Sequence, residues 1–152
     1  MDKLAIDGGR PVRASTLPYG RHSIDEEDIN AVVSVLRGDW LTTGPHVGEF
    51  ERALTAATRA PHAVAVSNGT AALHAAMHAG HVGPGDEVIV PPMTFAATAN
   101  AALYAGATPV FADVQPDTLL LDPRAAQAAI TPRTKAIVAV DYAGQAAEYA
   151  TL

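Results

Sequence analysis

The chain has 152 residues, of which 49% are hydrophobic and 17% charged, as in folded globular proteins and unlike disordered chains. Its net charge of −6 argues against a nucleic-acid partner, and the absence of cysteine excludes disulfides and thiolate metal sites. The apolar runs are too short to span a bilayer, and the N-terminus does not have the pattern of a secretory signal. We therefore expect a soluble cytoplasmic protein that binds neither nucleic acid nor a membrane.

The first sixty residues predict an extended arm followed by two helices. Residues 1–22 lack hydrophobic periodicity and contain prolines and glycines, which favours the arm. Ser23 and Glu26 have the spacing of a capping box, and Gly38 stands where a helix would end, so we predict a helix between them. A second helix is predicted around Glu49–Thr58.

From residue 61 onward, short runs rich in Val, Ile and Ala alternate with helical segments. The predicted strands are residues 62–66, 87–90, 108–114 and 135–140. The predicted helices are Thr70–Ala79, Phe95–Tyr104 and one that begins with Asp122 as N-cap and Pro123 as first residue. This alternation predicts an α/β fold with a mostly parallel sheet and helices on both faces. It also divides the chain into an N-terminal part, residues 1–60, and an α/β part, residues 61–152.

The last residues, 145–152, have the pattern of a helix that has only begun. They contain no stop signal. We therefore expect the chain to be the N-terminal part of a longer protein.

A turn of small residues, Ser67–Thr70, joins a predicted strand to a predicted helix. Backbone N–H groups at a helix N-terminus can point at an anion, and the helix dipole favours negative charge there. The Thr70 hydroxyl can donate a further bond to a phosphate oxygen. The turn is a candidate phosphate site, although a plain turn with Asn68 or Thr70 as cap is the commoner explanation of such a pattern.

Phe95 lies just past the carboxyl end of the predicted strand 87–90, after Pro91 and Pro92. Ligands of open parallel sheets bind at this edge, so an aromatic ring here could stack on a flat cofactor. The alternative is a core residue packed under the following helix.

The loop of residues 39–45, DWLTTGP, contains the single tryptophan of the chain, Trp40. Its hydroxyls and its turn suit contact with a ligand or a second subunit. The alternative is an ordinary loop with a packed indole.

Taken in order, these segments resemble the DegT/DnrJ/EryC1/StrS family of sugar aminotransferases. The resemblance runs from about Tyr19 to Gln145 and is carried by the strings LTTGP, AVAVSNGTAALHAA, GPGDEVIVPPMTF, LYAGATPVFADVQPDT and VDYAGQ. Within the family, PYG at Tyr19, DWLTTGP and VDYAGQ most resemble the branch of UDP-4-amino-4,6-dideoxy-N-acetyl-β-L-altrosamine transaminases.

The resemblance implies a fold type I transferase that uses pyridoxal 5'-phosphate and works as a homodimer, with active sites at the subunit interface. The residues matching cofactor positions are Asn68, Gly69 and Thr70 at the phosphate, Phe95 on the pyridine ring, and Gln145 near the active-site edge. The residues matching substrate positions are Tyr19, Asp39, Trp40, Leu41 and Thr42.

The implied reaction is amino transfer from glutamate to a keto group of a nucleotide-linked deoxysugar. The family's cofactor-binding lysine and its carboxylate for the pyridine nitrogen match no position up to Leu152. Lys135 opens a strand at the opposite edge of the sheet, so we expect the 152-residue chain alone to be inactive. Two alternatives stay open: a dehydratase of the same family with histidine in place of the lysine, and a non-catalytic remnant or binding module.

Three histidines, His74, His78 and His81, lie close together on and after a predicted helix. The i, i+4 spacing of the first two could serve zinc, but no third ligand of fixed geometry accompanies them. Surface or packing histidines explain the pattern better, so no metal is predicted.

Overall fold

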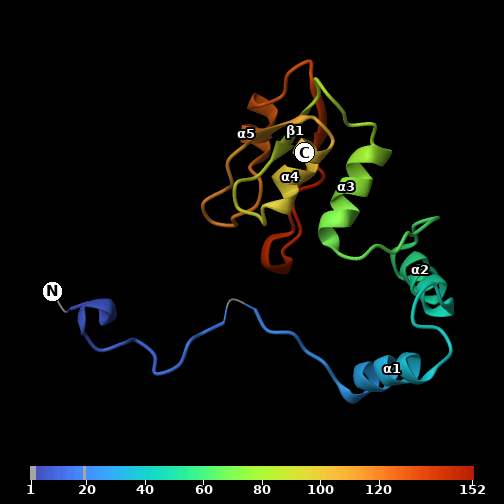
Figure 1. Ribbon diagram of the computed structural model, residues 1–152. Coiled ribbons are helices and arrows are strands. Elements are labelled where there is room, and N and C mark those ends of the chain that lie inside the picture. Colours follow the sequence, from blue (N-terminus) through green and yellow to red (C-terminus); the bar gives the residue numbers. More distant parts are fainter. Residues whose placement is uncertain (1–2, 19) are drawn as a thin grey trace. The chain divides into compact units, whose positions relative to one another are not determined.

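The computed structural model describes residues 3–18 and 20–152, and the chain divides into two compact units, Met1–Ala63 and Val64–Leu152 (Figure 1). The helices of the first unit are η1 (Ala5–Asp7), α1 (Glu26–Arg37) and α2 (Pro45–Thr58). Neither α1 nor α2 contains a buried residue. The predicted pair of helices is therefore present, preceded by a largely irregular segment.

The capping box of α1 is formed by Asp25 and Asp28, so the predicted box of Ser23 and Glu26 is wrong. The Asp25 side chain accepts hydrogen bonds from the N–H of Glu27 at 2.9 Å and of Asp28 at 3.1 Å, and the Asp28 carboxylate accepts from the Asp25 N–H at 3.1 Å. Aspartate is as good an N-cap as serine, and the acidic run offers the pair at the correct spacing. The helix ends at Gly38 as predicted.

Helix α2 begins at Pro45, earlier than the predicted Glu49. Proline suits the first position of a helix because its fixed φ is helical and its missing N–H would have no partner there.

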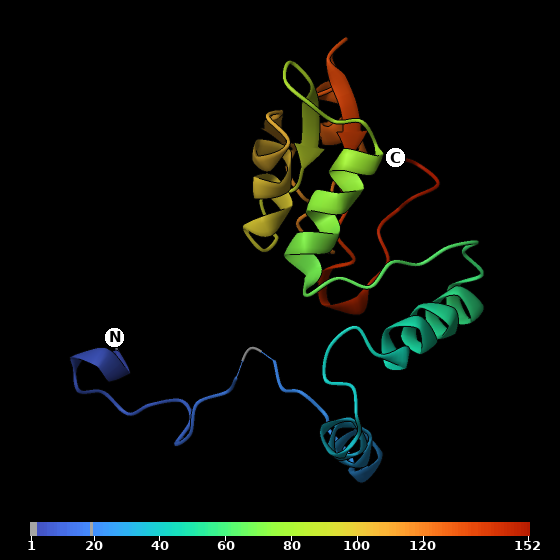
Figure 2. The same cartoon turned by 45° about the vertical axis from the view of Figure 1, so that its right-hand side comes forward.

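The second unit contains the predicted α/β alternation (Figure 2). Its elements are α3 (Gly69–Ala79), β1 (Glu87–Val90), α4 (Ala97–Tyr104), β2 (Thr108–Phe111), α5 (Pro123–Ala128), β3 (Thr134–Ile137) and η2 (Tyr142–Gly144). Along the described residues, no helix has the length and apolar character required to cross a membrane.

The strands form one parallel three-stranded sheet in the order β2-β1-β3. Glu87 is in register with Thr108 of β2 and with Thr134 of β3. All four residues of β1 are buried. This is expected for a central parallel strand covered on both faces.

Successive residues of β1 point to two separate cores. Val88 and Val90 pack with residues of α3 and α4, among them Met77 and Ala101. Ile89 packs on the other face with Ala126 of α5. The strand's period of two thus places α3 and α4 on one face of the sheet and α5 on the other.

Residues 62–66 form no strand, so this prediction is wrong. The apolar run indicates extended backbone, but a strand also needs a neighbour with which to share a hydrogen-bond ladder. The described sheet ends at β3 on one side and at β2 on the other.

Two predicted strands are shorter than expected, and the predicted helix at 145–152 is absent. Strand β2 ends at Phe111, and Val114 instead bridges Leu121 in antiparallel fashion. Strand β3 ends at Ile137, although the Val138 N–H still donates to Ile89 at 2.8 Å. The segment after η2 forms a turn around Tyr149, because the Asp141 carboxylate accepts hydrogen bonds from the Ala147 N–H and from the Tyr149 hydroxyl.

Candidate functional site

A cavity of about 650 Å³ lies where the N-terminal ends of α3 and α4 meet, and the two helices pack side by side (Figure 2). It is lined by Gly69 and Thr70 from α3 and by Phe95 and Thr98 at the start of α4, with alanines and a leucine between them. Phe95 follows β1, so the cavity lies toward the carboxyl end of this strand. The structure thus brings together the two features that the sequence predicted separately.

The start of α3 is capped by Asn68. Its side-chain oxygen accepts from the N–H of Ala71 at 2.9 Å, its carbonyl accepts from Ala72 at 3.1 Å, and its amide donates to the Ser67 hydroxyl at 3.2 Å. The cap predicted as the commoner explanation is therefore present. Because the Asn68 side chain is used in this way, it contributes to an anion site by shaping the turn.

The N–H groups of Gly69 and Thr70 are the first two of α3 and have no partner within the helix. A Cβ atom built on Gly69 would meet nothing within 4 Å, so the space in front of this backbone is open. Two unpaired N–H groups, the Thr70 hydroxyl and the positive end of the helix dipole suit a phosphate. The residues present therefore fit a phosphate-bearing ligand.

Phe95 is 78% exposed, so it is not a core residue under α4. The residues that turn inward at the start of this helix are Ala97 and Thr98, both buried. An exposed ring beside an apolar cavity offers a face on which a flat ligand can stack.

Gln145 lies just after η2 and is exposed, and it does not line this cavity. Asp141 lies between the end of β3 and Gln145 along the chain. The Asp141 carboxylate accepts from the Ala147 N–H at 2.9 Å and from the Tyr149 hydroxyl at 2.7 Å. These hydrogen bonds lower the pKa of Asp141, and the Asp141 carboxylate raises the pKa of Tyr149.

The predicted substrate residues belong to the first unit. Trp40 and Leu41 are exposed, so the alternative of a packed indole does not hold. The loop is tight, since a Cβ atom on Gly44 would lie 2.8 Å from the Cβ of Trp40. Asp39 and Thr42 are exposed in the same loop. Tyr19 lies outside the described residues.

The sequence interpretation missed a pair of threonines beside the cavity. The Oγ1 atoms of Thr94 and Thr98 are 2.8 Å apart, and Thr98 is only 5% exposed. Their i, i+4 spacing across the start of a helix was a visible signal.

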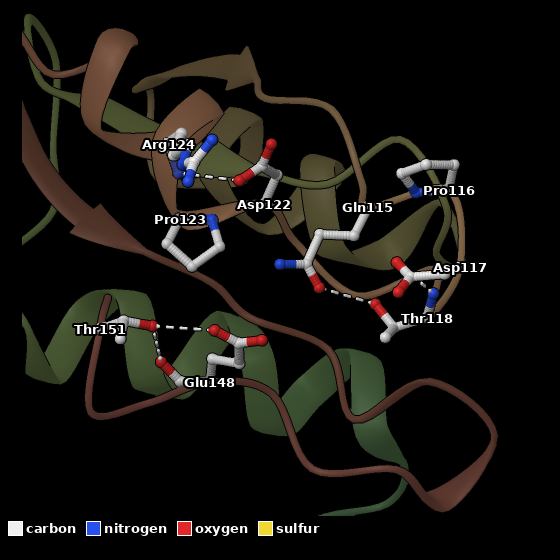
Figure 3. Close-up of a pocket in the computed structure, with 9 residues that line it drawn as sticks. All are labelled: Gln115, Pro116, Asp117, Thr118, Asp122, Pro123, Arg124, Glu148 and Thr151. Carbon is white, nitrogen blue, oxygen red and sulfur yellow. Dashed lines mark hydrogen bonds between the residues drawn. The ribbon is translucent and has the colours of Figure 1, made fainter.

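A second cavity, of about 560 Å³, surrounds the start of α5 (Figure 3). Its polar side chains bond to their neighbours: the Asp122 carboxylate accepts from the Arg124 N–H at 2.9 Å, and the Thr118 hydroxyl donates to Gln115 at 2.9 Å. One wall comes from Glu148 and Thr151 near the C-terminus. This cavity contains none of the predicted site residues.

The His74 ring packs against Tyr104, with ring centroids 5.7 Å apart. In the described part of the chain, no group of three or more His, Cys, Asp or Glu side chains is placed to hold a metal ion.

A parallel sheet whose connecting helices direct their N-termini to a cavity beyond a strand's carboxyl end is typical of α/β proteins that bind phosphate-bearing ligands. The chain belongs to the DegT/DnrJ/EryC1/StrS aminotransferase family, whose model matches residues 22–152.

Among its relatives is the spore coat polysaccharide biosynthesis protein SpsC of Bacillus subtilis, 49% identical over 132 residues that cover 87% of this chain and 34% of SpsC. Similar solved structures include the sugar aminotransferase Spr1654 of Streptococcus pneumoniae in its PLP form, with 42% identity and a TM-score of 0.82 over 90% of this chain and 35% of that one. An aminotransferase of Psychrobacter cryohalolentis has 36% identity and a TM-score of 0.80, over 88% of this chain and 35% of its own. The chain thus spans about a third of the length of these relatives.

Proposed function

We propose that this chain supplies the phosphate- and ring-binding part of a pyridoxal 5'-phosphate-dependent aminotransferase that acts on a nucleotide-linked keto sugar with glutamate as donor. The observation that carries the proposal is the cavity shared by Gly69, Thr70 and Phe95. Solved structures of the relative Spr1654 include a PLP form and a PMP form, which supports the same cofactor here.

In this proposal different residues of the cavity bind different parts of the cofactor. The N–H groups of Gly69 and Thr70 and the Thr70 hydroxyl would bind the phosphate, and the Phe95 ring would lie on the pyridine ring. When bound, the cofactor would act as the electron sink and carrier of the amino group. Gln145 and the loop Asp39–Thr42, with Tyr19, remain proposed contacts of the cofactor edge and of the nucleotide sugar.

We further propose that the 152 residues alone do not turn over substrate. Lys135 lies in β3 level with the start of β1, whereas Phe95 follows the end of β1. Its amine is therefore at the wrong end of the sheet for the cavity. The family's lysine and its carboxylate for the pyridine nitrogen are expected in the part of the relatives that this chain does not span.

Two finer points belong to the same proposal. The substrate class is that of the UDP-4-amino-4,6-dideoxy-N-acetyl-β-L-altrosamine transaminase branch, on the resemblance of PYG at Tyr19, DWLTTGP and VDYAGQ. The complete form is a homodimer, as the family implies.

The test is a fusion of residues 1–152 to the corresponding C-terminal part of SpsC. We expect the soluble fusion to bind pyridoxal 5'-phosphate and to aminate a nucleotide-linked keto sugar in a glutamate-dependent manner, and we expect Phe95→Ala to lower this activity. A soluble fusion that binds the cofactor but aminates no keto sugar would contradict the proposal, and one that binds only the nucleotide sugar would favour the binding module.

A further inference from the structure

Two threonine hydroxyls bracket Phe95 at the cavity. Thr94 directly precedes Phe95, Thr98 lies one helical turn further along, and their Oγ1 atoms are 2.8 Å apart. The N–H of Thr98 also donates to the carbonyl of Phe95 at 3.0 Å. Thr98 is therefore bonded to Phe95 through the backbone and to the preceding residue through its side chain.

The exposure of Phe95 makes such a restraint necessary. With 78% of the residue exposed, packing does not immobilise the ring, and an exposed side chain keeps much of its rotational freedom. A ring that stacks on a ligand must be held parallel to the plane of that ligand, and rotational freedom that the ring loses on binding weakens the binding.

The start of α4 has no side-chain cap of its own, since Ala96 occupies the N-cap position. The hydroxyl pair is thus the side-chain hydrogen bond that spans the turn between β1 and α4. Thr98 is 5% exposed, so its hydroxyl is shielded from bulk water and depends on Thr94 as partner. Removal of either hydroxyl leaves the other without this bond.

We propose that the Thr94–Thr98 hydroxyl pair is a positioning device that holds the Phe95 ring against the flat face of the bound ligand. The proposal rests on the proposed function, because that function assigns ring stacking to Phe95.

The experiment uses the fusion of residues 1–152 to the C-terminal part of SpsC, labelled with 4-fluorophenylalanine and observed by fluorine NMR. The signal lost in Phe95→Leu is that of Phe95, and the signal lost in Phe111→Leu is that of Phe111. We expect Thr98→Val, which keeps the shape and removes the hydroxyl, to shift or broaden the Phe95 signal. The Phe111 signal from β2 should stay, showing that the sheet is intact.

A titration with pyridoxal 5'-phosphate gives the second readout. We expect Thr98→Val to raise its Kd about three- to tenfold, the effect of one lost hydrogen bond, and Thr98→Ser to restore wild-type values because it keeps the hydroxyl. Thr94→Val should change the Phe95 signal and the Kd as Thr98→Val does. If Thr98→Val also loses the Phe111 signal, its sheet is disturbed, and Thr94→Val then provides the test.

An unchanged Phe95 signal in both valine variants would overturn the proposal, as would a Thr98→Ser variant as impaired as Thr98→Val, since only packing would then matter. Failure of the proposed function is distinguishable. If the proposed function is wrong, Phe95→Leu will bind pyridoxal 5'-phosphate as well as the wild type does. A shifted Phe95 signal in Thr98→Val would still support the restraint on the ring in that case.

Discussion

Thr70 combines two hydrogen-bond donors at one place, its backbone N–H and its hydroxyl, both beside the open backbone of Gly69. The hydroxyl can be removed without changing the shape of the side chain. Position 70 therefore separates phosphate binding from the folding of α3 better than Asn68, whose side chain also caps the helix.

We predict that Thr70→Val in the completed enzyme weakens pyridoxal 5'-phosphate binding by about 1–2 kcal/mol, because a hydrogen bond to a charged group is lost. The measurement is the cofactor Kd at constant pH and ionic strength. Thr108→Val is a matched control, since Thr108 is an exposed threonine at the start of β2 and does not line the cavity. Equal Kd values for Thr70→Val and wild type would show that the Thr70 hydroxyl does not bind the phosphate.

Glu87 illustrates a different use of charge, at the start of β1. Glu87 is 7% exposed. Its carboxylate accepts hydrogen bonds from the Thr131 hydroxyl and from the Arg133 guanidinium, whose Nε lies 2.9 Å away. These bonds, Thr131 first, lower the pKa of Glu87 below its ordinary value of 4.5. The site ties β1 to the segment before β3 at the end of the sheet remote from the candidate cavity.

We predict that Glu87 makes the second unit sensitive to acid. Because the native pKa is lowered, the unfolded chain takes up the proton first as the pH falls. The stabilisation is complete above pH 4.5 and is lost as the pH drops through the lower native pKa. Chemical unfolding at several pH values should show a smaller acid-dependent decrease in Glu87→Gln than in wild type, together with lower stability at neutral pH. Glu148→Gln, which removes an exposed carboxylate of the same unit, should keep the decrease.

At the scale of the element, α1 begins with a different N-cap from the one that the sequence pattern favoured. Ser23 and Asp25 are both good caps, and the pair Asp25 and Asp28 has the reciprocal geometry. The acidic first turn also complements the helix dipole.

We predict that Asp25→Ala destabilises α1 by about 1 kcal/mol, the usual cost of losing an N-cap. Ser23→Ala should have no such effect. The measurement is the amide hydrogen-exchange protection of residues 26–37 in the two variants. Loss of protection in Ser23→Ala but not in Asp25→Ala would show that the cap is at Ser23 after all.

At the scale of the whole molecule, the second unit has a small sheet with apolar side chains in solvent. Strands β2 and β3 are its edges in the described residues, and Phe111, Leu103 and Val64 are exposed. Unpaired strand edges and exposed apolar surface favour association between chains.

We predict that the isolated 152-residue chain self-associates and is only marginally stable. Sedimentation velocity over a range of concentrations should show a rising average mass, and Phe111→Lys should reduce it by placing a charge on the β2 edge. A monomer that unfolds sharply at a midpoint independent of concentration would contradict this prediction.

The sequence by itself determined the elements whose signals are local. Asp122 and Pro123 mark the start of α5, Gly38 ends α1, and residues 87–90 became β1 without a change of boundary, because caps and short Val- and Ile-rich runs are patterns of neighbouring residues. The ordered motifs also identified the family correctly.

The tertiary structure alone decided what depends on distant partners. Residues 62–66 form no strand because pairing, unlike extended backbone, requires a neighbour in space. The exposure of Phe95 follows from the packing of α4, which turns Ala97 and Thr98 inward instead. The meeting of Gly69, Thr70 and Phe95 in one cavity arises because the parallel helices α3 and α4 bring their N-termini to the same end of the sheet.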